Sequence, residues 1–179
     1  EKVMNLQVFN KDEMEKMYQA MVANMLDDQK EEICKTYGSM ENYHDSFLDK
    51  AGDENVQKNY QKLVEWYGSK ENVMDSMESI PSAELMKAMQ NRMESIYKKL
   101  AKKLADGVTD VHCFEVREIM GEMDFVSRKM YNMDDVSALM LDMAGLYREN
   151  EDVRRGFDAA YGDGMSDYFV AAVTDFYCS

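Results

Sequence analysis

Apolar residues recur every three or four positions along most of the chain, which is the spacing of one face of an α-helix. The pattern is clearest after Ser82, where one apolar face continues until Asp106 and Gly107 end it. The members of this face are Leu85, Met89, Met93, Ile96, Leu100 and Leu104. Because no segment alternates apolar and polar residues long enough to predict a strand, we predict an all-α fold with this helix at its centre.

The same spacing, together with residues that cap or break helices, places the other helices. We expect Asp110 to cap one helix and either Asn132 or Asp134 to cap the next. Asn150 should open a brief helix that ends at Tyr161, before a glycine-containing break. The predicted ranges are about 11–35, 39–51, 58–67, 69–79, 82–105, 111–130, 136–147, 150–161 and 165–176.

One short segment of the chain occurs twice. YGSMENYHDSF at residues 37–47 returns at residues 67–77 as YGSKENVMDSM, with seven of the eleven positions unchanged. Each copy has an aromatic residue that closes a helix, a glycine that leaves it and a serine that opens the next. The repeat therefore predicts two corners of the same kind, each between consecutive helices.

Composition supports the helical prediction and excludes several classes of function. The 179 residues suit one domain of ordinary size with room for a small appendage, and only nine are Gly and one is Pro. A formal net charge of -14 means that nucleic acids and anionic membranes repel the chain, so we expect direct binding to neither. The sequence has no apolar run of about twenty residues for a membrane span, and its N-terminus lacks the layout of a signal peptide. We expect a cytoplasmic protein whose three separated cysteines are reduced thiols.

The candidate reactive groups form no recognisable catalytic or metal site. Glu41 and His44 have the Glu-x-x-His spacing of carboxylate-bridged di-iron bundles, but the second copy of the repeat has Met74 in place of the histidine. His112 and Cys113 are adjacent, so on a helix they point about a hundred degrees apart and cannot act together on one substrate or metal. We therefore expect no catalytic residue, no metal, no cofactor and no enzymatic activity.

Methionine and aromatic residues are the main indication of a binding surface. The chain has 18 Met, whose flexible side chains let a surface repack around dissimilar apolar ligands. Many of them fall on helix faces, so filling a core is the alternative. The aromatic residues could likewise line a cleft or fill a core. They are Trp66, Tyr67, Tyr97, Phe114, Tyr131, Tyr147, Phe157, Tyr161, Tyr168 and Phe169.

Four segments of the chain occur in a recognisable order. They are Tyr67-Gly68, Asp106-Gly107, the stretch VRRGFDAA at 153–160, and Gly164 to Tyr168. Their order and approximate spacing resemble the TipA-S antibiotic-recognition domain, the effector-binding half of certain MerR-type transcriptional regulators. The resemblance covers the chain from residue 67 to the end.

The resemblance implies a globin-like helical domain whose N-terminal helices form one wall of a cleft and order over a bulky antibiotic. In the family, a helix followed by a corner leads into the domain, and this chain contains that pair twice. We therefore expect residues 1–66 to contain an extra helical lid and residues 67–179 to form the ligand-binding body.

Two acidic residues depart from the family pattern. The founding member of the family holds its ligand through a cysteine, and the matching position here is Asp142, while a second family cysteine falls on Asp135. A carboxylate cannot perform thiolate addition, so we expect reversible binding. Seven residues apart on one helix face, the two aspartates would supply the counter-charge to a cationic ligand; the alternative is that both are solvated surface acids.

On this resemblance we predict the effector-binding domain of a MerR-type regulator that reversibly binds bulky hydrophobic or cationic drugs in a helical cleft. If a MerR-type half precedes residue 1, DNA would be bound through that half, and we leave open a homodimer of the full-length protein. The alternative is a helical interaction module that holds an amphipathic partner helix. The expected ligand-binding residues are Trp66, Tyr67, Tyr97, Phe114, Tyr131, Asp135, Asp142 and Tyr168.

Overall fold

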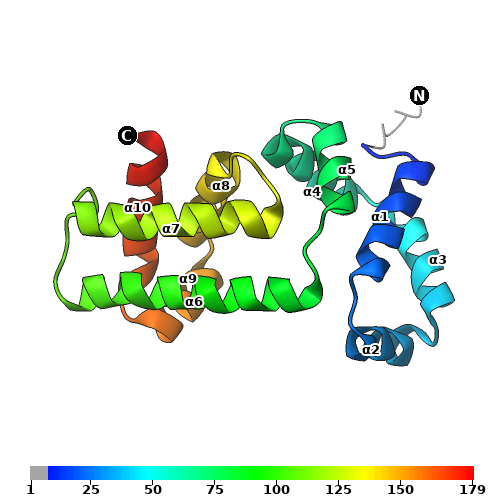
Figure 1. Ribbon diagram of the computed structural model, residues 1–179, viewed down its shortest axis with the longest axis horizontal. Helices are drawn as coiled ribbons and strands as arrows, with labels where there is room; N and C mark the ends of the chain where they lie inside the picture. Colours follow the sequence, from blue (N-terminus) through cyan, green and yellow to red (C-terminus); the bar gives the residue numbers. More distant parts are fainter. Residues whose placement is uncertain (1–7) are drawn as a thin grey trace. The chain divides into compact units, whose positions relative to one another are not determined.

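The computed structural model of the protein describes residues 8–179 and has helices and no strand in that range (Figure 1). The prediction of an all-α fold is confirmed. The helices are α1 (Lys11–Ala23), α2 (Asp27–Tyr37), α3 (Met40–Lys50), α4 (Glu54–Tyr67), α5 (Lys70–Glu78), α6 (Ala83–Ala105), α7 (Phe114–Tyr131), α8 (Ser137–Glu149), α9 (Glu151–Tyr161) and α10 (Met165–Cys178).

The chain folds as two compact units that divide between Ala83 and Glu84. The functional boundary predicted between residues 66 and 67 falls at the end of α4, inside the first of these units. That boundary was predicted between a lid and a ligand-binding body, not between two compact units. It stays a prediction.

In the first unit, α1 packs against both α3 and α5, the second helix of each repeated corner. Phe9, just before α1, is fully buried there and meets Tyr60 of α4 edge to face, with ring centroids 5.5 Å apart. The Met residues of α1 recur at helical spacing, so they lie on one apolar face, and this face packs into the core. The core residues of this unit are Phe9, Met14, Met17, Ala51 and Val73.

The repeated segment forms the same corner twice, as predicted. In the first copy Gly38 leaves α2 with φ +90°, a conformation that favours glycine because it has no Cβ. The Ser39 hydroxyl then accepts a hydrogen bond from the Asn42 backbone N–H at 3.0 Å, and the Asn42 side chain donates to Tyr37 O at 2.9 Å. The second copy repeats each element with Gly68, Ser69, Asn72 and Tyr67. The positions that are identical in the two copies therefore include all the residues that make these capping contacts.

The single helix predicted for residues 11–35 is wrong, because the chain forms α1 and α2 with a break between them. Asn24 ends α1, and its side-chain amide donates to Ala20 O at 2.8 Å. The next helix is opened by Gln29, whose side chain accepts from the Leu26 backbone N–H at 2.9 Å. The Asn24 side chain competes with the backbone hydrogen bonds of α1, whereas the Gln29 side chain satisfies a backbone N–H at the start of α2. The apolar spacing continues across the break and conceals it.

Two predicted helix caps are also wrong. Asp110 accepts from the His112 backbone N–H in the loop, and α7 begins only at Phe114. Asn132 ends α7 with φ +50° rather than opening α8. Asp134 does not open α8 either, because the N-cap position is Val136, which makes no side-chain cap. Asp135, one residue earlier, accepts from the Ser137 backbone N–H at 2.8 Å. The cap of α9 by Asn150, in contrast, is confirmed, with the Val153 N–H as its donor at 3.0 Å.

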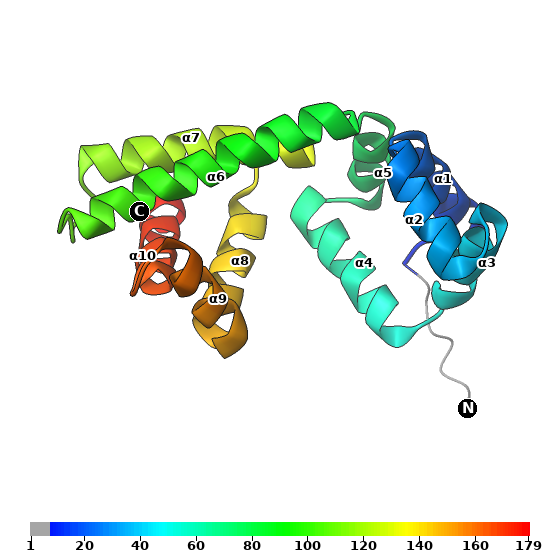
Figure 2. The same ribbon diagram turned by 90° about the horizontal axis from the view of Figure 1, so that it is seen from below.

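The second unit consists mainly of α6 to α10. α6 and α7 run antiparallel side by side (Figure 1), and α8, α9 and α10 lie together on one side of this pair (Figure 2). α10 packs against α7, α8 and α9, and its Tyr168 hydroxyl donates to Val108 O at 2.7 Å in the loop after α6. The largest fully buried side chains here are Ile96, Leu100, Val116, Met120, Met123, Val126, Met140, Met165 and Phe169.

The stretch VRRGFDAA, which carries much of the family resemblance, lies within α9 and makes hydrogen bonds to the start of α10. Asp158 accepts from the Ser166 backbone N–H at 2.7 Å, and the Ser166 hydroxyl donates to Arg154 O at 3.1 Å. The Arg154 guanidinium pairs with Asp167 at 2.8 Å. This network fixes the turn between α9 and α10, and so it positions the aromatic side chains that both helices contribute to the second unit.

Candidate functional site

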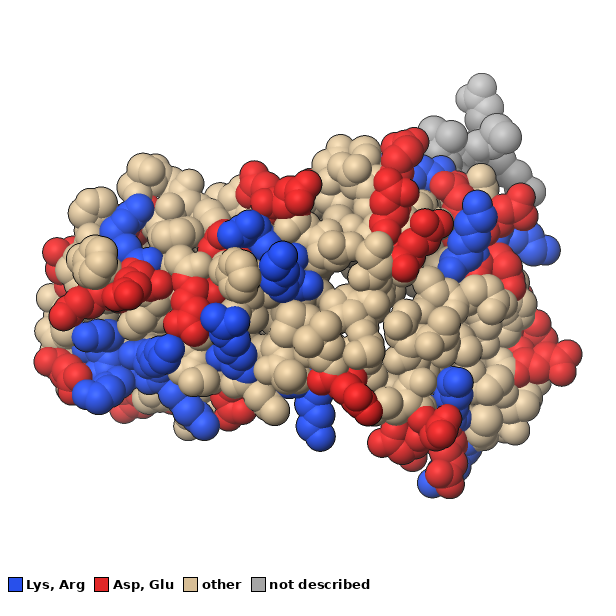
Figure 3. Space-filling model, in the orientation of Figure 1, with Lys and Arg blue, Asp and Glu red and all other residues tan. Residues whose placement is uncertain are grey.

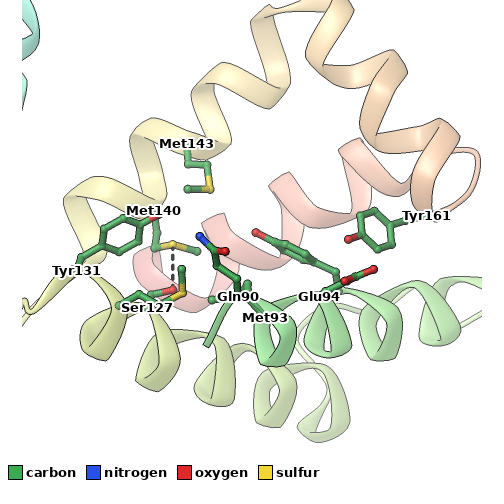
Figure 4. Close-up of a pocket in the computed structure, with 10 residues that line it drawn as sticks. Gln90, Met93, Glu94, Ser127, Tyr131, Met140, Met143 and Tyr161 are labelled. Carbon is green, nitrogen blue, oxygen red and sulfur yellow. Dashed lines mark hydrogen bonds between the residues drawn. The ribbon is translucent and has the colours of Figure 1, made fainter. Parts of the chain in front are cut away.

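The second unit contains a pocket of about 330 Å³ between α6, α7, α8 and the end of α9 (Figure 4). Its lining is mostly methionine and tyrosine, with a few polar residues. The lining residues are Gln90, Met93, Glu94, Tyr97, Ser127, Met130, Tyr131, Met140, Met143 and Tyr161. A volume of this size lies at the small end of the range of ligand-binding cavities, which is about 300–1,000 Å³.

The deepest lining residues are apolar or internally hydrogen-bonded. Met93, Ser127 and Met140 are all buried. The Ser127 hydroxyl donates to the Met140 Sδ at 3.8 Å (Figure 4), so the one hydroxyl at this depth has a partner within the protein. Methionine side chains are flexible and polarisable, and this region can therefore adapt to apolar guests of different outline.

Three tyrosines form the aromatic part of the wall. Tyr97 packs edge to face on Phe157 and at a tilt on Tyr161, with ring centroids 5.5 Å apart in both pairs. Burial raises the pKa of Tyr97 well above its ordinary value of 10, and burial also raises the pKa of Tyr131 and of Tyr161. All three phenols are therefore neutral at physiological pH, and the pocket offers aromatic faces and hydroxyls without phenolate charge.

The polar residues Gln90 and Glu94 are exposed, one helical turn apart on α6. Glu94 is the one lining residue with a formal charge. Its Oε1 lies 3.4 Å from the Nζ of Lys98, one further turn along the same helix. The pocket thus combines a buried apolar floor with two exposed polar groups.

The structure brings two of the predicted site residues together in this pocket, Tyr97 and Tyr131. Of the others in the second unit, Phe114 is 78% exposed at the start of α7, and Tyr168 is buried against the loop after α6. Trp66 and Tyr67 belong to α4 in the first unit, where Tyr67 packs against the core. A role in ligand binding stays a prediction for each of these residues.

The expected placement of Asp135 and Asp142 on one helix face is wrong. α8 begins at Ser137, so Asp135 precedes the helix and accepts from the N–H of its first residue, while Asp142 lies within it. The hydrogen bonds from Ser137 lower the pKa of Asp135, as expected for a carboxylate at a helix N-terminus. Both aspartates are exposed, and neither lines the pocket.

Sequence reasoning missed most of the pocket lining. Gln90, Glu94 and Tyr97 follow one another at spacings of four and three residues, which places them on one face of α6. The sequence contained one signal of this pocket, a polar residue beside the apolar stripe of α6. The stripe alone, however, does not show at which point along α6 the facing helices leave a cavity.

The first unit contains a second depression, lined by Lys11, Met14, Asp45, Leu48, Asp49 and Ala51. Nearby, His44 pairs with Glu15 of α1 and lies 3.6 Å from Asp45, so the Glu-x-x-His histidine makes contacts between helices. Within residues 8–179 no three His, Cys, Asp or Glu side chains are grouped in a way that could hold a metal ion.

Charged side chains of both signs are scattered among uncharged ones on the face that Figure 3 shows. The C-terminal half of α6 is rich in lysine, but these lysines have acidic partners: Lys99 pairs with Glu122, Lys102 with Asp106 and Lys103 with Glu115. None of the described helices is long and apolar enough to cross a membrane.

The fold and the pocket define an all-α domain with a small methionine- and tyrosine-lined cavity. The model of the TipAS antibiotic-recognition domain family matches residues 60–176, which is more than half of the chain, and the protein therefore belongs to this family. A search of curated proteins and a search of solved structures each found no match. The matched segment begins within α4 and includes the second corner, whereas the first corner precedes it. The resemblance inferred from the sequence is confirmed, and the chain carries a domain of an antibiotic-recognition class.

Proposed function

We propose that the protein is the effector-binding part of a MerR-type transcriptional regulator and reversibly binds hydrophobic antibiotics or related drugs in the pocket of its second unit. The observation that carries the proposal is the pocket itself: a buried methionine floor and neutral tyrosine walls, inside the segment that matches the TipAS family. Such a surface favours apolar and aromatic ligands because they gain most from leaving water.

The size of the pocket limits how a bulky antibiotic would bind. At about 330 Å³ it accommodates one ring system or a comparable apolar group, and the rest of a large ligand would extend beyond it. Burying about 200 Å² of apolar ligand surface contributes roughly 5 kcal/mol at 25 cal/mol per Å², before the cost of immobilising the ligand is subtracted. The pocket would therefore anchor a ligand whose full affinity needs further contacts.

The positions of the cysteines support reversible rather than covalent binding. Cys113 immediately precedes α7 and Cys178 ends α10, while Cys34 belongs to the first unit. None of the three lines the pocket. A ligand anchored there meets thioether and phenol groups, which do not add to electrophilic ligands as a thiolate does.

We further propose a lid role for residues 1–66, which include α1–α3 and most of α4. In our proposal this segment acts as an additional lid or wall, and its ordering when the ligand binds is the event passed to a DNA-binding half. A ligand can shift that equilibrium only by binding the closed state more tightly than the open one. The capping contacts shared by the two corners support the proposal, since a duplicated lead-in element would retain the geometry of the first.

The proposal is tested by filling the pocket. Met143 and Leu146 lie almost one turn apart on α8; the first lines the pocket, and the second is 49% exposed and does not. Met143→Trp should abolish or strongly weaken binding of Nile red, a neutral apolar dye whose fluorescence reports its surroundings. Leu146→Trp is the matched control and should bind as the wild type does.

Competition then connects the pocket to antibiotics. Hydrophobic antibiotics that displace Nile red from the wild-type protein, and that raise its melting temperature, support the proposal. Equal Nile red binding by the Met143→Trp and Leu146→Trp variants would show that the dye binds elsewhere and would overturn it.

A further inference from the structure

The pocket has one formally charged lining residue, Glu94, in otherwise neutral surroundings of methionine and tyrosine. We infer that this pocket selects monovalent organic cations with an aromatic or apolar body, and that Glu94 is the residue that recognises their charge. The inference rests on the proposed function, because it specifies the ligand class of the same pocket.

The geometry places the carboxylate beside the aromatic wall. Glu94 lies on α6 one turn before Tyr97, and Figure 4 shows its side chain on the same side of the pocket as Tyr161 of α9. The charge of Glu94 contributes, after burial, to the raised pKa of Tyr161, as expected for a carboxylate close to a phenol. A guest that places its cationic group near Glu94 would therefore have its apolar body against the tyrosines and methionines.

The tyrosine rings favour a cation for a second reason. The face of an aromatic ring carries partial negative charge and attracts ammonium and similar groups within about 6 Å of its centroid. Tyr97, Tyr131 and Tyr161 all line the pocket and, because burial raises their pKa values, they remain neutral rings with this property. The charge of an anionic guest would gain nothing from the ring faces and would be repelled by Glu94.

Lys98 is the competitor that a cationic guest must displace. Its Nζ lies 3.4 Å from Glu94 Oε1, but the side chains are 68% and 55% exposed. An exposed pair of this kind contributes little to stability, because water screens it and both side chains lose freedom when they pair. The ammonium of Lys98 can swing into solvent at small cost and leave the carboxylate to the guest.

This assignment replaces the counter-charge expected at Asp135 and Asp142. Asp135 accepts from the Ser137 backbone N–H at the start of α8, Asp142 is exposed on that helix, and neither lines the pocket. Glu94 is the acidic residue that the fold brings to a cavity of suitable chemistry.

The test uses two probes of nearly equal shape and opposite charge, tetraphenylphosphonium and tetraphenylborate, with neutral Nile red as reference. Affinities are measured for the wild type and for Glu94→Gln and Lys98→Gln. The matched controls are Glu151→Gln and Arg155→Gln, which break an exposed pair with the same spacing and the same 3.4 Å distance on α9, outside the pocket lining.

We expect the wild type to prefer the phosphonium. Glu94→Gln should lower phosphonium affinity about three- to tenfold while leaving Nile red unchanged, the range expected for a partly screened charge. Lys98→Gln should raise phosphonium affinity, because it removes the competitor. The two α9 variants should remain within about twofold of the wild type, since distant exposed charges act weakly through screening.

Opposite effects of the two α6 variants are the decisive result, because both break the same ion pair. Equal effects would mean that the pair acts structurally and would overturn the inference, as would unchanged phosphonium affinity in Glu94→Gln. In either case, Nile red binding that is lost in Met143→Trp would leave the proposed function standing. Failure of all three probes to bind the wild type would overturn the proposed function and the inference together.

Discussion

Phe169 provides the sharpest test of how the second unit supports its pocket. This residue of α10 is completely buried and lies directly behind the aromatic wall. Its ring meets Tyr97 at a centroid distance of 5.9 Å, Tyr147 at 5.1 Å and Phe157 at 5.5 Å. The perturbation is Phe169→Ala, which removes the ring and leaves all three neighbours with an unfilled side.

The expected cost is large because Phe169 is fully buried and its ring makes three aromatic contacts. Truncating a buried Phe to Ala typically destabilises a protein by about 3–5 kcal/mol, which includes the cavity left behind. Edge-to-face aromatic pairs contribute about 0.5–1.5 kcal/mol each beyond their buried area. Phe169 takes part in three such contacts, so we expect a value in the upper part of that range, about 4–5 kcal/mol. A typical domain has a total stability of about 5–15 kcal/mol, so the loss would be a substantial fraction of it.

The assay is urea unfolding followed by far-ultraviolet circular dichroism, with Phe114→Ala as the matched control. Phe114 is 78% exposed in the same unit, and its truncation should change the free energy of unfolding by no more than about 0.5 kcal/mol. If Phe169→Ala still folds, it should also bind Nile red less tightly, because Tyr97 loses an edge contact that orients it. A loss below about 1 kcal/mol in Phe169→Ala, or equal losses in the two variants, would refute the assignment of Phe169 to the core.

Two further predictions concern the first unit. Asn42→Ala and Asn72→Ala each remove the hydrogen bond from a corner asparagine to the tyrosine carbonyl that ends the preceding helix, so each should lower the free energy of unfolding by about 1 kcal/mol in urea titrations. Unchanged stability in both variants would contradict a structural role of the repeat. The hydrogen bond to Glu15, followed by the charges of Glu15 and Asp45, raises the pKa of His44 above its ordinary 6.5. Because the folded-state pKa is the higher one, the stabilisation is complete below pH 6.5 and is lost as pH rises through the raised value. Melting temperatures of the wild type and His44→Gln should therefore differ most in acid and converge at alkaline pH; a difference that grows with pH would contradict this sign.

Much of the fold was predictable because helix formation is governed by local interactions. The spacing of apolar residues from Ser82 gave α6 almost to the residue, and the repeated segment gave both corners. The break between α1 and α2 was missed because Asn24 and Gln29 act through side-chain contacts that do not interrupt the apolar spacing. Periodicity also failed to show that Leu85 is 53% exposed while Ile96 and Leu100 on the same stripe are fully buried.

The pocket was predictable only in part. Six of the ten aromatic candidates were expected in the site, and of these the pocket is lined by Tyr97 and Tyr131. It is also lined by Tyr161, a candidate that was not selected. Whether an aromatic or methionine side chain fills a core or borders a cavity depends on which neighbours face it, and those neighbours come from other helices. Glu94 was missed because an acid on an acidic surface has no distinctive local signal, and because residues of other helices decide which acid borders a cavity.

The sequence by itself determined the helical class, most helix ends, the duplicated corner and the family, because each depends on residues close together in the chain or on their order. The tertiary structure alone decided which residues surround the pocket and which acid is placed beside it. That assignment requires α6, α7, α8 and α9 to be packed together, and packing is settled by the shapes of side chains far apart in sequence.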